Sequence, residues 1–461
     1  MKFRNDSLDI DANDPFANDA LERKPIVEFV ETVITKAEGP MVLALDSPWG
    51  TGKTTFVKML SAQLERKNFH CIYFNAWSVD YATDPLAALV SKISLLDENE
   101  NTTLTSRVKK LKSIATLVGK RGVIAAVKAT TLGGLDLDKE YEAIFAQGNG
   151  DIASDLFDRV TKEGELLAKF KEELQAYVQD LQKEDEPSNL IFFIDELDRC
   201  RPDFAIELLE RIKHLFDVPN IIFVLSIDKT QLEISTAAIY GANFNSREYL
   251  RRFIDLEFQL PQVSDKPFVK HLLARFELHE ILSVRNNDFP SDESDFLDVF
   301  CLLAKTTNMS LRTQEQSIAR LAIVLDQTPP DEYLYPILVA TLIIVRVMNP
   351  QLYSELKSGS ASSEELMTWI FNSGDNTALK KSQEAIAINA YVNAADTDTN
   401  RKKIRLKQLE AIEGQTEFGE EEDSYSIKVL KFTRHLEKVR SNRVPKIHRL
   451  MEKIDLTENF R

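Results

Sequence analysis

The stretch that decides the fold is Met41–Leu60, MVLALDSPWGTGKTTFVKML. Its first five residues are apolar and predict a buried strand, which runs directly into a turn-prone segment, Asp46–Gly52. A helical pattern begins at Lys53. Strand, glycine-containing loop and helix, in this order, form the setting in which a phosphate-binding loop works. The stretch therefore predicts a nucleotide site, the alternative being a tight turn that contains Gly-Lys-Thr by coincidence.

Each residue type in this loop has a chemical reason. Gly50 and Gly52 let backbone N–H groups approach phosphate oxygens where a Cβ would interfere, and the helix that follows directs its positive end at the same anion. Lys53 is expected to bind the β- and γ-phosphates, and Thr54 to supply a hydroxyl ligand for Mg²⁺. One position departs from the usual motif, because Ser47 stands where glycine is common. The other predicted nucleotide contacts are Trp49, Thr51 and Thr55.

Composition limits the classes of protein to consider. The chain has 461 residues, 43% of them hydrophobic, which is enough for two or three domains with real cores. No apolar run reaches the ~20 residues that span a membrane, and the polar N-terminal sequence is not that of a signal peptide. Three widely separated cysteines match no metal spacing and indicate a reducing, cytoplasmic setting. The net charge of −16 does not favour nucleic acid as a partner.

Strand and helix patterns alternate up to about residue 262 and then become helical throughout. Alternation of this kind predicts an α/β fold, a parallel sheet covered by helices on both faces. Within the second strand, Phe74 and Trp77 are expected to pack beneath the P-loop helix. The expected organisation is an N-terminal arm over residues 1–20, a P-loop domain over 21–262 with a helical insertion at about 98–188, a helical lid over 263–350, and a helical C-terminal region over 351–461.

A second group of candidate residues follows an apolar strand, LIFFI, at Leu190–Ile194. Asp195 and Glu196 close this strand, which we expect to lie beside the P-loop strand. Asp195 is predicted to bind Mg²⁺ and Glu196 to polarise the attacking water as a general base. Ser226 closes the next strand, where a polar side chain could contact the γ-phosphate. A strand that merely ends in exposed polar residues is the alternative.

Three arginines are candidates for stabilising charge in the transition state. Arg251 and Arg252 lie just before the last predicted strand, and either could act across a subunit boundary. Of the two, Arg252 is assigned the catalytic role, and ordinary surface ion pairing is the alternative for both. Arg312 begins a helix of the following domain and is predicted to reach the nucleotide.

Taken together, these segments resemble the KAP family of P-loop NTPases, a branch of the AAA+/STAND-like ATPases. The resemblance rests on four stretches: SPWGTGKTTF at the loop, FNAWSVDYATDPLAALV from Phe74, IDELDRCRPDFAIELLERIKHLF from Ile194, and IIFVLSIDKTQLE with YLRRFIDLEFQLP. It implies a sheet with the P-loop strand beside the Walker B and sensor strands, a helical lid, and ATP hydrolysis that drives a change of conformation or assembly. Bacterial defence against phages and plasmids is the biological setting that it implies.

The expected function is that of a soluble ATPase that uses ATP and Mg²⁺, forms a homo-oligomer and controls a separate effector protein. Two alternatives remain open. A nucleic-acid-handling motor would need basic segments, such as Arg401–Lys407 and Lys428–Arg449, to face one groove. A nucleotide-gated scaffold would bind ATP with little hydrolysis. The basic part of the insertion, which includes Arg107 and Lys110, is interpreted as a solvated helix face rather than a nucleic-acid patch.

Overall fold

The computed structural model of the chain describes residues 10–37, 39–82, 84–96, 102–119, 152–181, 189–261, 265–285, 292–396, 403–404, 407, 411, 421–439 and 447–455. The chain divides into two compact units. The P-loop unit comprises Arg23–Pro261 with the preceding Asp9–Asp19, and the helical unit comprises the chain from Gln262 onward together with Ala20–Glu22.

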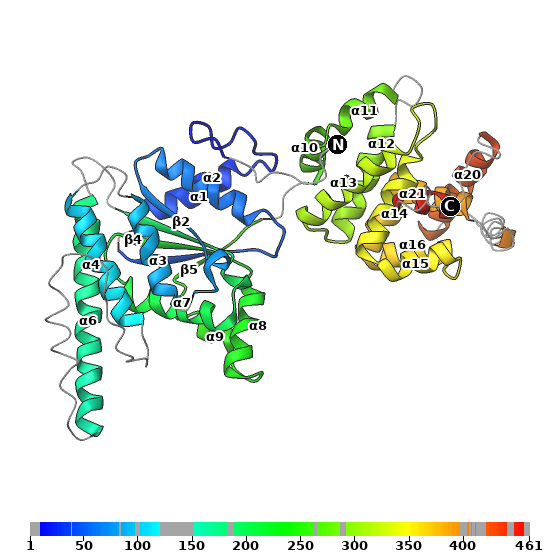
Figure 1. Cartoon of the computed structure of the whole chain (residues 1–461). Helices are drawn as coiled ribbons and strands as arrows, with labels where there is room; N and C mark the ends of the chain where they lie inside the picture. Colours follow the sequence, from blue (N-terminus) through cyan, green and yellow to red (C-terminus); the bar gives the residue numbers. More distant parts are fainter. Residues whose placement is uncertain are drawn as a thin grey trace. The chain divides into compact units, whose positions relative to one another are not determined.

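A parallel sheet of five strands, counted over the described residues, forms the centre of the P-loop unit (Figure 1). The strands are β1 (Met41–Asp46), β2 (His70–Asn75), β3 (Leu190–Asp195), β4 (Ile221–Ile227) and β5 (Leu256–Gln259), in the spatial order β2-β3-β4-β1-β5. The predicted fold class is thus confirmed. The expectation that the strand ending at Asp195 lies beside the P-loop strand is wrong, because β4 lies between them. Alternation along a sequence sets the direction of strands but not their lateral order.

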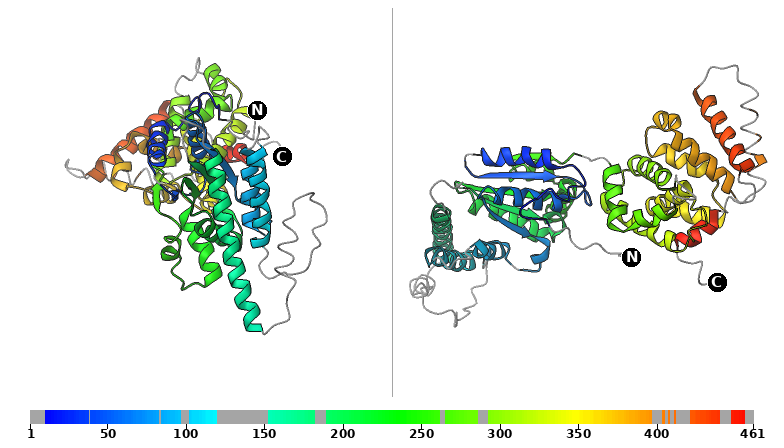
Figure 2. Two further views of the ribbon diagram at one scale, coloured as in Figure 1. Left: turned by 90° about the vertical axis from the view of Figure 1, so that its left-hand side faces the viewer. Right: turned by 90° about the horizontal axis from the view of Figure 1, so that it is seen from above.

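Helices cover both faces of this sheet (Figures 1 and 2). Side chains alternate along each strand, so Ile191 and Phe193 of β3 join the core on one face, and Phe192 and Ile194 join the core on the other. The first face is covered by α1 (Lys24–Thr35) and α2 (Lys53–Glu65). The second is covered by α3 (Pro85–Ile93), α4 (Thr102–Gly119), α6 (Ile152–Leu181), α7 (Pro202–Leu215), α8 (Lys229–Tyr240) and α9 (Ser246–Leu250), with short 3₁₀ turns η1 (Trp77–Val79), η2 (Ser94–Leu96) and η3 (Leu197–Arg199).

The two aromatic residues expected beneath the P-loop helix lie elsewhere. Phe74 pairs in register with Ile194 and is fully buried on the face opposite α2, because the alternation of β2 directs it there. Trp77 follows the end of β2 in η1 and is 53% exposed. This expectation was wrong for both residues.

The helical insertion contributes a pair of helices, α4 and α6, that pack against each other on the α3 side of the unit (Figure 1). Their charges are complementary. Arg107 of α4 forms ion pairs with Glu173, at 3.2 Å, and with Asp180 of α6, and Lys110 reaches Glu173 at 3.1 Å. These two basic side chains are therefore partly neutralised by the neighbouring helix. Lys120 and Arg121 lie outside the described residues.

The helical unit has its own hydrophobic core, centred on α14, whose residues from Pro336 to Val345 are all buried. Leu352 and Met451 belong to the same core as Leu338, so it continues across residue 350, where the sequence suggested a division. The helices of this unit are α10 (Asp265–Arg275), α11 (Leu278–Arg285), α12 (Asp292–Thr306), α13 (Leu311–Asp326), α14 (Pro336–Met348), α15 (Pro350–Ser358), α16 (Ser363–Asn372), α17 (Asn376–Lys381), α18 (Gln383–Ala395), α20 (Glu421–Val439) and α21 (Ile447–Ile454).

The chain ahead of α1 was expected to form an arm over residues 1–20. Residues 1–9 lie outside the described part. Ile10 and Phe16 are partly buried and pack against the core that α1, α2 and β1 share. At least these two apolar side chains therefore attach the segment to the P-loop unit.

Candidate nucleotide site

The loop between β1 and α2 has the backbone that its glycines predict. Gly50 and Gly52 both adopt left-handed conformations, with φ of 78° and 83°, which a residue with a Cβ adopts at a cost. Gly52 is the N-cap of α2, so the first N–H groups of that helix open toward the loop. The N–H of Ser47 donates to Ile227 O of β4 at 3.1 Å and fixes the start of the loop to the sheet.

Side chains of Lys53, Ser47 and Thr51 form hydrogen bonds within the loop. The Lys53 ammonium donates to the backbone oxygen of Ser47 and, at 3.2 Å, to that of Pro48. Desolvation lowers the pKa of Lys53, and the nearby carboxylates of Asp198, Asp228 and Asp195 oppose this shift. Ser47 Oγ donates to Thr51 Oγ1, and Thr51 Oγ1 donates to Pro48 O, each at 2.8 Å. The serine that replaces the usual glycine is thus accommodated as part of the loop's own hydrogen bonding.

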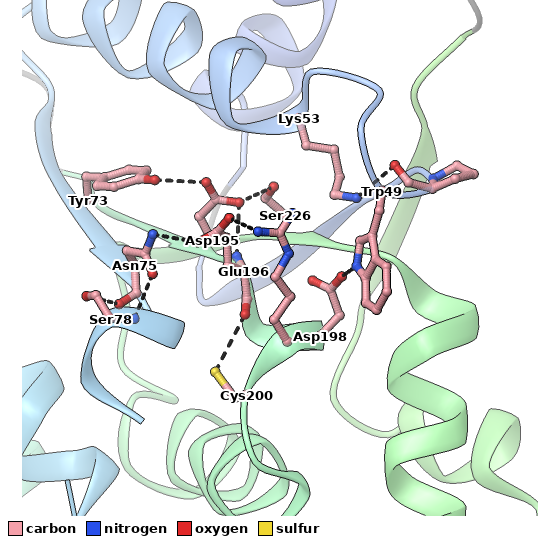
Figure 3. Close-up of polar contacts among 12 residues, drawn as sticks. Trp49, Lys53, Tyr73, Asn75, Ser78, Asp195, Glu196, Asp198, Cys200 and Ser226 are labelled. Carbon is pink, nitrogen blue, oxygen red and sulfur yellow. Dashed lines mark hydrogen bonds and ion pairs between the residues drawn. The ribbon is translucent and has the colours of Figure 1, made fainter. Parts of the chain in front are cut away.

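Three polar side chains meet in one row at the carboxyl ends of the strands. Asn75, Asp195 and Ser226 are register partners across β2, β3 and β4. The Asp195 carboxylate is almost fully buried and accepts hydrogen bonds from Tyr73 Oη at 2.8 Å and from Ser226 Oγ at 2.7 Å (Figure 3). Desolvation, followed by the charge of Asp195, raises the pKa of Tyr73, so Tyr73 remains a hydrogen-bond donor. Asp195 is held in one orientation by two hydroxyl groups.

Glu196 is held in a different way. Its backbone is left-handed, with φ of 60°, which turns its side chain away from the line of β3. Asn75 Nδ2 donates to Glu196 Oε2 at 2.8 Å (Figure 3). Arg199 Nη1 pairs with Glu196 Oε1 at 2.5 Å. Both carboxylate oxygens therefore have partners in this structure.

The loop is also joined to the segment that follows Glu196. The Trp49 indole N–H donates to Asp198 Oδ2, and Asp198 Oδ1 is buried without a hydrogen-bond partner (Figure 3). Desolvation raises the pKa of Asp198, whereas the bond from Trp49 and the charge of Lys53 lower it. The Arg199 guanidinium lies 5.9 Å from the Trp49 ring centre and 5.7 Å from that of Trp77, within the range of cation–π attraction. The contacts of Trp49 thus connect the loop with the residues that hold Glu196.

Sequence reasoning missed a buried arginine behind the loop. Arg23 is 3% exposed and donates to Gly52 O at 2.9 Å and to Thr51 O at 2.6 Å. It precedes α1 in an ordinary charged sequence, Glu-Arg-Lys-Pro, and no local pattern distinguishes it from a surface residue. Tyr73, Asn75 and Asp198 were missed for the same reason.

The donors present fit Mg²⁺. Asp195 offers a fixed, buried carboxylate, and Thr54 lies in the first turn of α2, next to Lys53. Mg²⁺ typically takes one or two protein oxygens and completes its shell with water and substrate phosphates. Asp195 and Thr54 are therefore the residues that would hold it. Thr55 shares the first turn of α2.

The described contacts do not test the roles predicted for two arginines, Arg252 and Arg312. Arg252 is exposed and precedes β5, whose neighbour Asp255 accepts a hydrogen bond from the N–H of Val42 at the amino end of β1. The loop lies at the opposite end of β1, about 16 Å away at ~3.3 Å per residue. A role for Arg252 across a subunit boundary stays a prediction. Arg312 is exposed on α13 of the helical unit, and its predicted contact with nucleotide also stays a prediction.

Other expectations concern membranes and nucleic acid. Over the described part of the chain, no helix is both long and apolar enough to cross a membrane. Of the basic segment Arg401–Lys407, only residues 403, 404 and 407 are described, and residues 440–446 of the second basic segment lie outside the described residues.

Comparisons with known proteins give a family match, a protein of similar sequence and two solved structures of low similarity. Residues 23–327 match the KAP family P-loop domain. An uncharacterized protein of Methanocaldococcus jannaschii is 27% identical over 180 residues, which cover 34% of this chain and 89% of that protein. Two solved structures of the Aeropyrum pernix ORC2 protein are similar at low TM-scores. Its ADPNP–ADP complexes give 0.33 at 14% identity, covering 95% of this chain and 94% of that one. Its ADP form gives 0.28 at 12% identity, covering 98% and 97%.

The family match spans well over half of the sequence and includes the glycine loop, the Asp195–Glu196 pair and Ser226. The chain belongs to the KAP family of P-loop NTPases.

Proposed function

We propose that this protein binds ATP with Mg²⁺ in the loop formed by residues 47–55 and hydrolyses the terminal phosphate. The observation that carries the proposal is the joint placement of three groups. Lys53 lies inside a left-handed glycine loop, Asp195 is fixed at the end of β3, and Glu196 follows it directly. The β4 residue Ser226 connects the P-loop strand with Asp195 by register and by hydrogen bond.

In the proposed reaction, a water oxygen attacks the γ-phosphorus, and the bond from that phosphorus to the β,γ-bridging oxygen breaks. The Glu196 carboxylate accepts the proton of the water, and ADP leaves with the electron pair of the broken bond. Lys53 and the backbone N–H groups of the loop bind the phosphate chain and oppose its charge. Mg²⁺, when bound at Asp195 and Thr54, supplies further neutralisation of the β- and γ-oxygens.

Glu196 must leave at least one of its present partners to act as a base toward water. In this structure its two oxygens face Asn75 and Arg199. The described arrangement is therefore a restrained form of the site, and nucleotide binding is the event expected to change it.

The test compares Glu196→Gln with a matched control, Glu248→Gln. Glu248 also pairs with an arginine three positions along the chain, Arg251, but both side chains are exposed. We expect Glu196→Gln to retain MgATP binding and to lower kcat for phosphate release by about 10²–10⁴-fold. The control should match the wild type in both. Equal, very low turnover in all three proteins, with intact ATP binding, would instead support the nucleotide-gated scaffold.

Lys53→Ala tests the binding half of the proposal separately. Loss of the ammonium group removes a charge that lies in the loop, so we expect MgATP binding to be lost or greatly weakened. Retention of wild-type affinity in this variant would contradict the proposed site. Titration with GTP and CTP alongside ATP tests which nucleobase the site prefers.

We extend the proposal to the biological level on the ground of family membership alone. The ATP cycle is proposed to switch the conformation or the assembly of a cytoplasmic homo-oligomer and thereby to control a partner effector, in bacterial defence against phages and plasmids. Mass measurement of the Glu196→Gln protein with ATP and with ADP tests the switch. A mass that is the same with both nucleotides would contradict assembly control. The proposed role in defence is tested by infecting bacteria that carry the wild-type or the Lys53→Ala protein with phage. Only the wild-type protein should protect them.

A further inference from the structure

Arg23 is the buried charge that the proposed reaction leaves without a role. It is the N-cap residue of α1, and its side chain crosses to the α2 side of the loop. Two of its nitrogens hydrogen-bond the consecutive carbonyls of Thr51 and Gly52, and its guanidinium carbon lies 5.9 Å from the ring centre of Phe56 in α2. The loop is thus held from behind by one side chain that is distant in sequence.

These two hydrogen bonds help to fix the orientation of two peptide groups. In a planar trans peptide the C=O and the following N–H point in opposite directions. When Arg23 binds the Thr51 and Gly52 carbonyls on one side, the N–H groups of Gly52 and Lys53 must point to the other side. Gly52 has φ of 83° and, as glycine, has several backbone conformations open to it. The Phe56 N–H of α2 also donates to Gly52 O, at 3.1 Å, so Arg23 adds a second donor at that carbonyl and supplies a side-chain donor at Thr51 O.

The charge of Arg23 adds to this effect. Desolvation lowers the pKa of Arg23 to about 10, and the carboxylate of Asp19 opposes that shift. The group is thus positively charged at neutral pH, although it is buried and its hydrogen-bond acceptors at the loop are uncharged carbonyls. A bound phosphate chain would supply nearby negative charge, and hydrogen bonds to the carbonyls polarise the same peptides whose N–H groups face the phosphates.

We propose that Arg23 is a positioning residue of the nucleotide site, which acts through the carbonyls of Thr51 and Gly52 to orient the Gly52 and Lys53 N–H groups toward the phosphates. The proposal rests on the proposed nucleotide site. A purely structural role for Arg23 would be to attach α1 to α2. Our proposal differs because it predicts that loss of Arg23 weakens the binding of phosphate-bearing ligands beyond any effect on the stability of the fold.

The experiment uses the full chain with Arg23→Met, Arg23→Lys and a matched control, Arg211→Met. Arg211 is also a buried arginine of the P-loop unit, 7% exposed, but it pairs with Glu207 within α7. Binding of MgATP, MgADP and inorganic tripolyphosphate is measured by calorimetry, together with the unfolding temperature without ligand and the kcat and KM of hydrolysis.

We expect Arg23→Met to raise the Kd for MgATP and for tripolyphosphate by a similar factor, about ten- to a hundredfold, because the lost hydrogen bonds act on the phosphate cradle. KM should rise with little change in kcat. Arg23→Lys, which keeps the charge, should lie between wild type and Arg23→Met. Arg211→Met should lose a comparable part of its thermal stability while its Kd values stay at those of the wild type.

Wild-type affinity in a folded Arg23→Met protein would overturn the role of Arg23 and leave the proposed function standing. If Arg23→Met does not fold, the same measurements are made on Arg23→Lys. Wild-type Kd and KM values for Arg23→Lys would likewise overturn the role of Arg23. A wild-type chain that binds neither MgATP nor tripolyphosphate would refute the nucleotide site itself. An equal loss of affinity in Arg211→Met would assign the effect to general destabilisation.

Discussion

The hydrogen bond from Trp49 to Asp198 gives a prediction whose size can be worked from the structure. The change is Trp49→Phe, which keeps an aromatic ring near Arg199 and removes the N–H donor together with part of the ring system. Hydrogen bonds to charged groups contribute about 1.5–3 kcal/mol. Trp49 is 43% exposed, so water can replace part of the lost bond, although the other oxygen of Asp198 is buried without a partner. We therefore expect a loss of about 1–2 kcal/mol in the free energy of unfolding.

The pH dependence of this loss follows from the ionisation of Asp198. Desolvation raises its pKa above 3.8, so ionisation of Asp198 costs stability as the pH rises through the raised value. The bond from Trp49 lowers the pKa and offsets part of that cost. Trp49→Phe raises the pKa further. Its effect should be complete at neutral pH and should decline as the pH falls through the pKa of Asp198.

The assay is calorimetric unfolding of the full chain, with the transition of the P-loop unit identified by its response to MgATP. For a unit of this size the expected loss lowers its Tm by about 2–8 °C at pH 7. Asp198→Ala, which removes the acceptor, supplies the second arm of a double-mutant cycle. A Tm loss that is the same in the Asp198→Ala background, or the same at pH 4 and pH 7, would refute the reasoning.

Three further predictions follow from single contacts. Ser47→Gly removes the bond to Thr51 and frees the backbone, so we expect a loss of about 1–2 kcal/mol in unfolding free energy but less than a threefold change in the Kd of MgATP; calorimetry measures both. Asn75→Ala frees one oxygen of Glu196 and should raise basal phosphate release about fivefold to tenfold, whereas a fall would show that Asn75 positions the base. Ile343→Ala removes a fully buried side chain of α14 and should destabilise the helical unit by about 2–5 kcal/mol in denaturant titrations, and a loss below 1 kcal/mol would contradict the packing described.

The parts of the site that are contiguous in sequence were predictable from it. The loop and α2 follow β1 without interruption, and local glycine and helix signals place them. Asp195 and Ser226 were expected at strand ends because each closes an apolar run, and parallel strands bring their carboxyl ends to one edge of the sheet. The nearly all-round apolar composition of α14 agrees with its burial.

The partners of these residues could not be predicted, because the order of the strands decides them. Tyr73 hydrogen-bonds Asp195 across 122 positions of sequence, and Asn75 hydrogen-bonds Glu196 across 121. Both contacts exist because β2 lies beside β3 in the sheet. Because the sequence does not give the lateral order of the strands, β3 was wrongly expected next to β1. Arg23 contacts carbonyl oxygens, which every residue has, so no side-chain pattern in the loop could have indicated it.

The register of the sheet has a consequence for how this chain can vary. Asn75, Asp195 and Ser226 lie side by side only if β2, β3 and β4 keep their present register. Deleting one residue from the middle of β3 would turn each following side chain of the strand to the opposite face, and Asp195, which is proposed to hold Mg²⁺, would lose its place beside Ser226. Insertions and deletions are therefore expected in the connections between strands and helices, where they leave the number of strand residues unchanged.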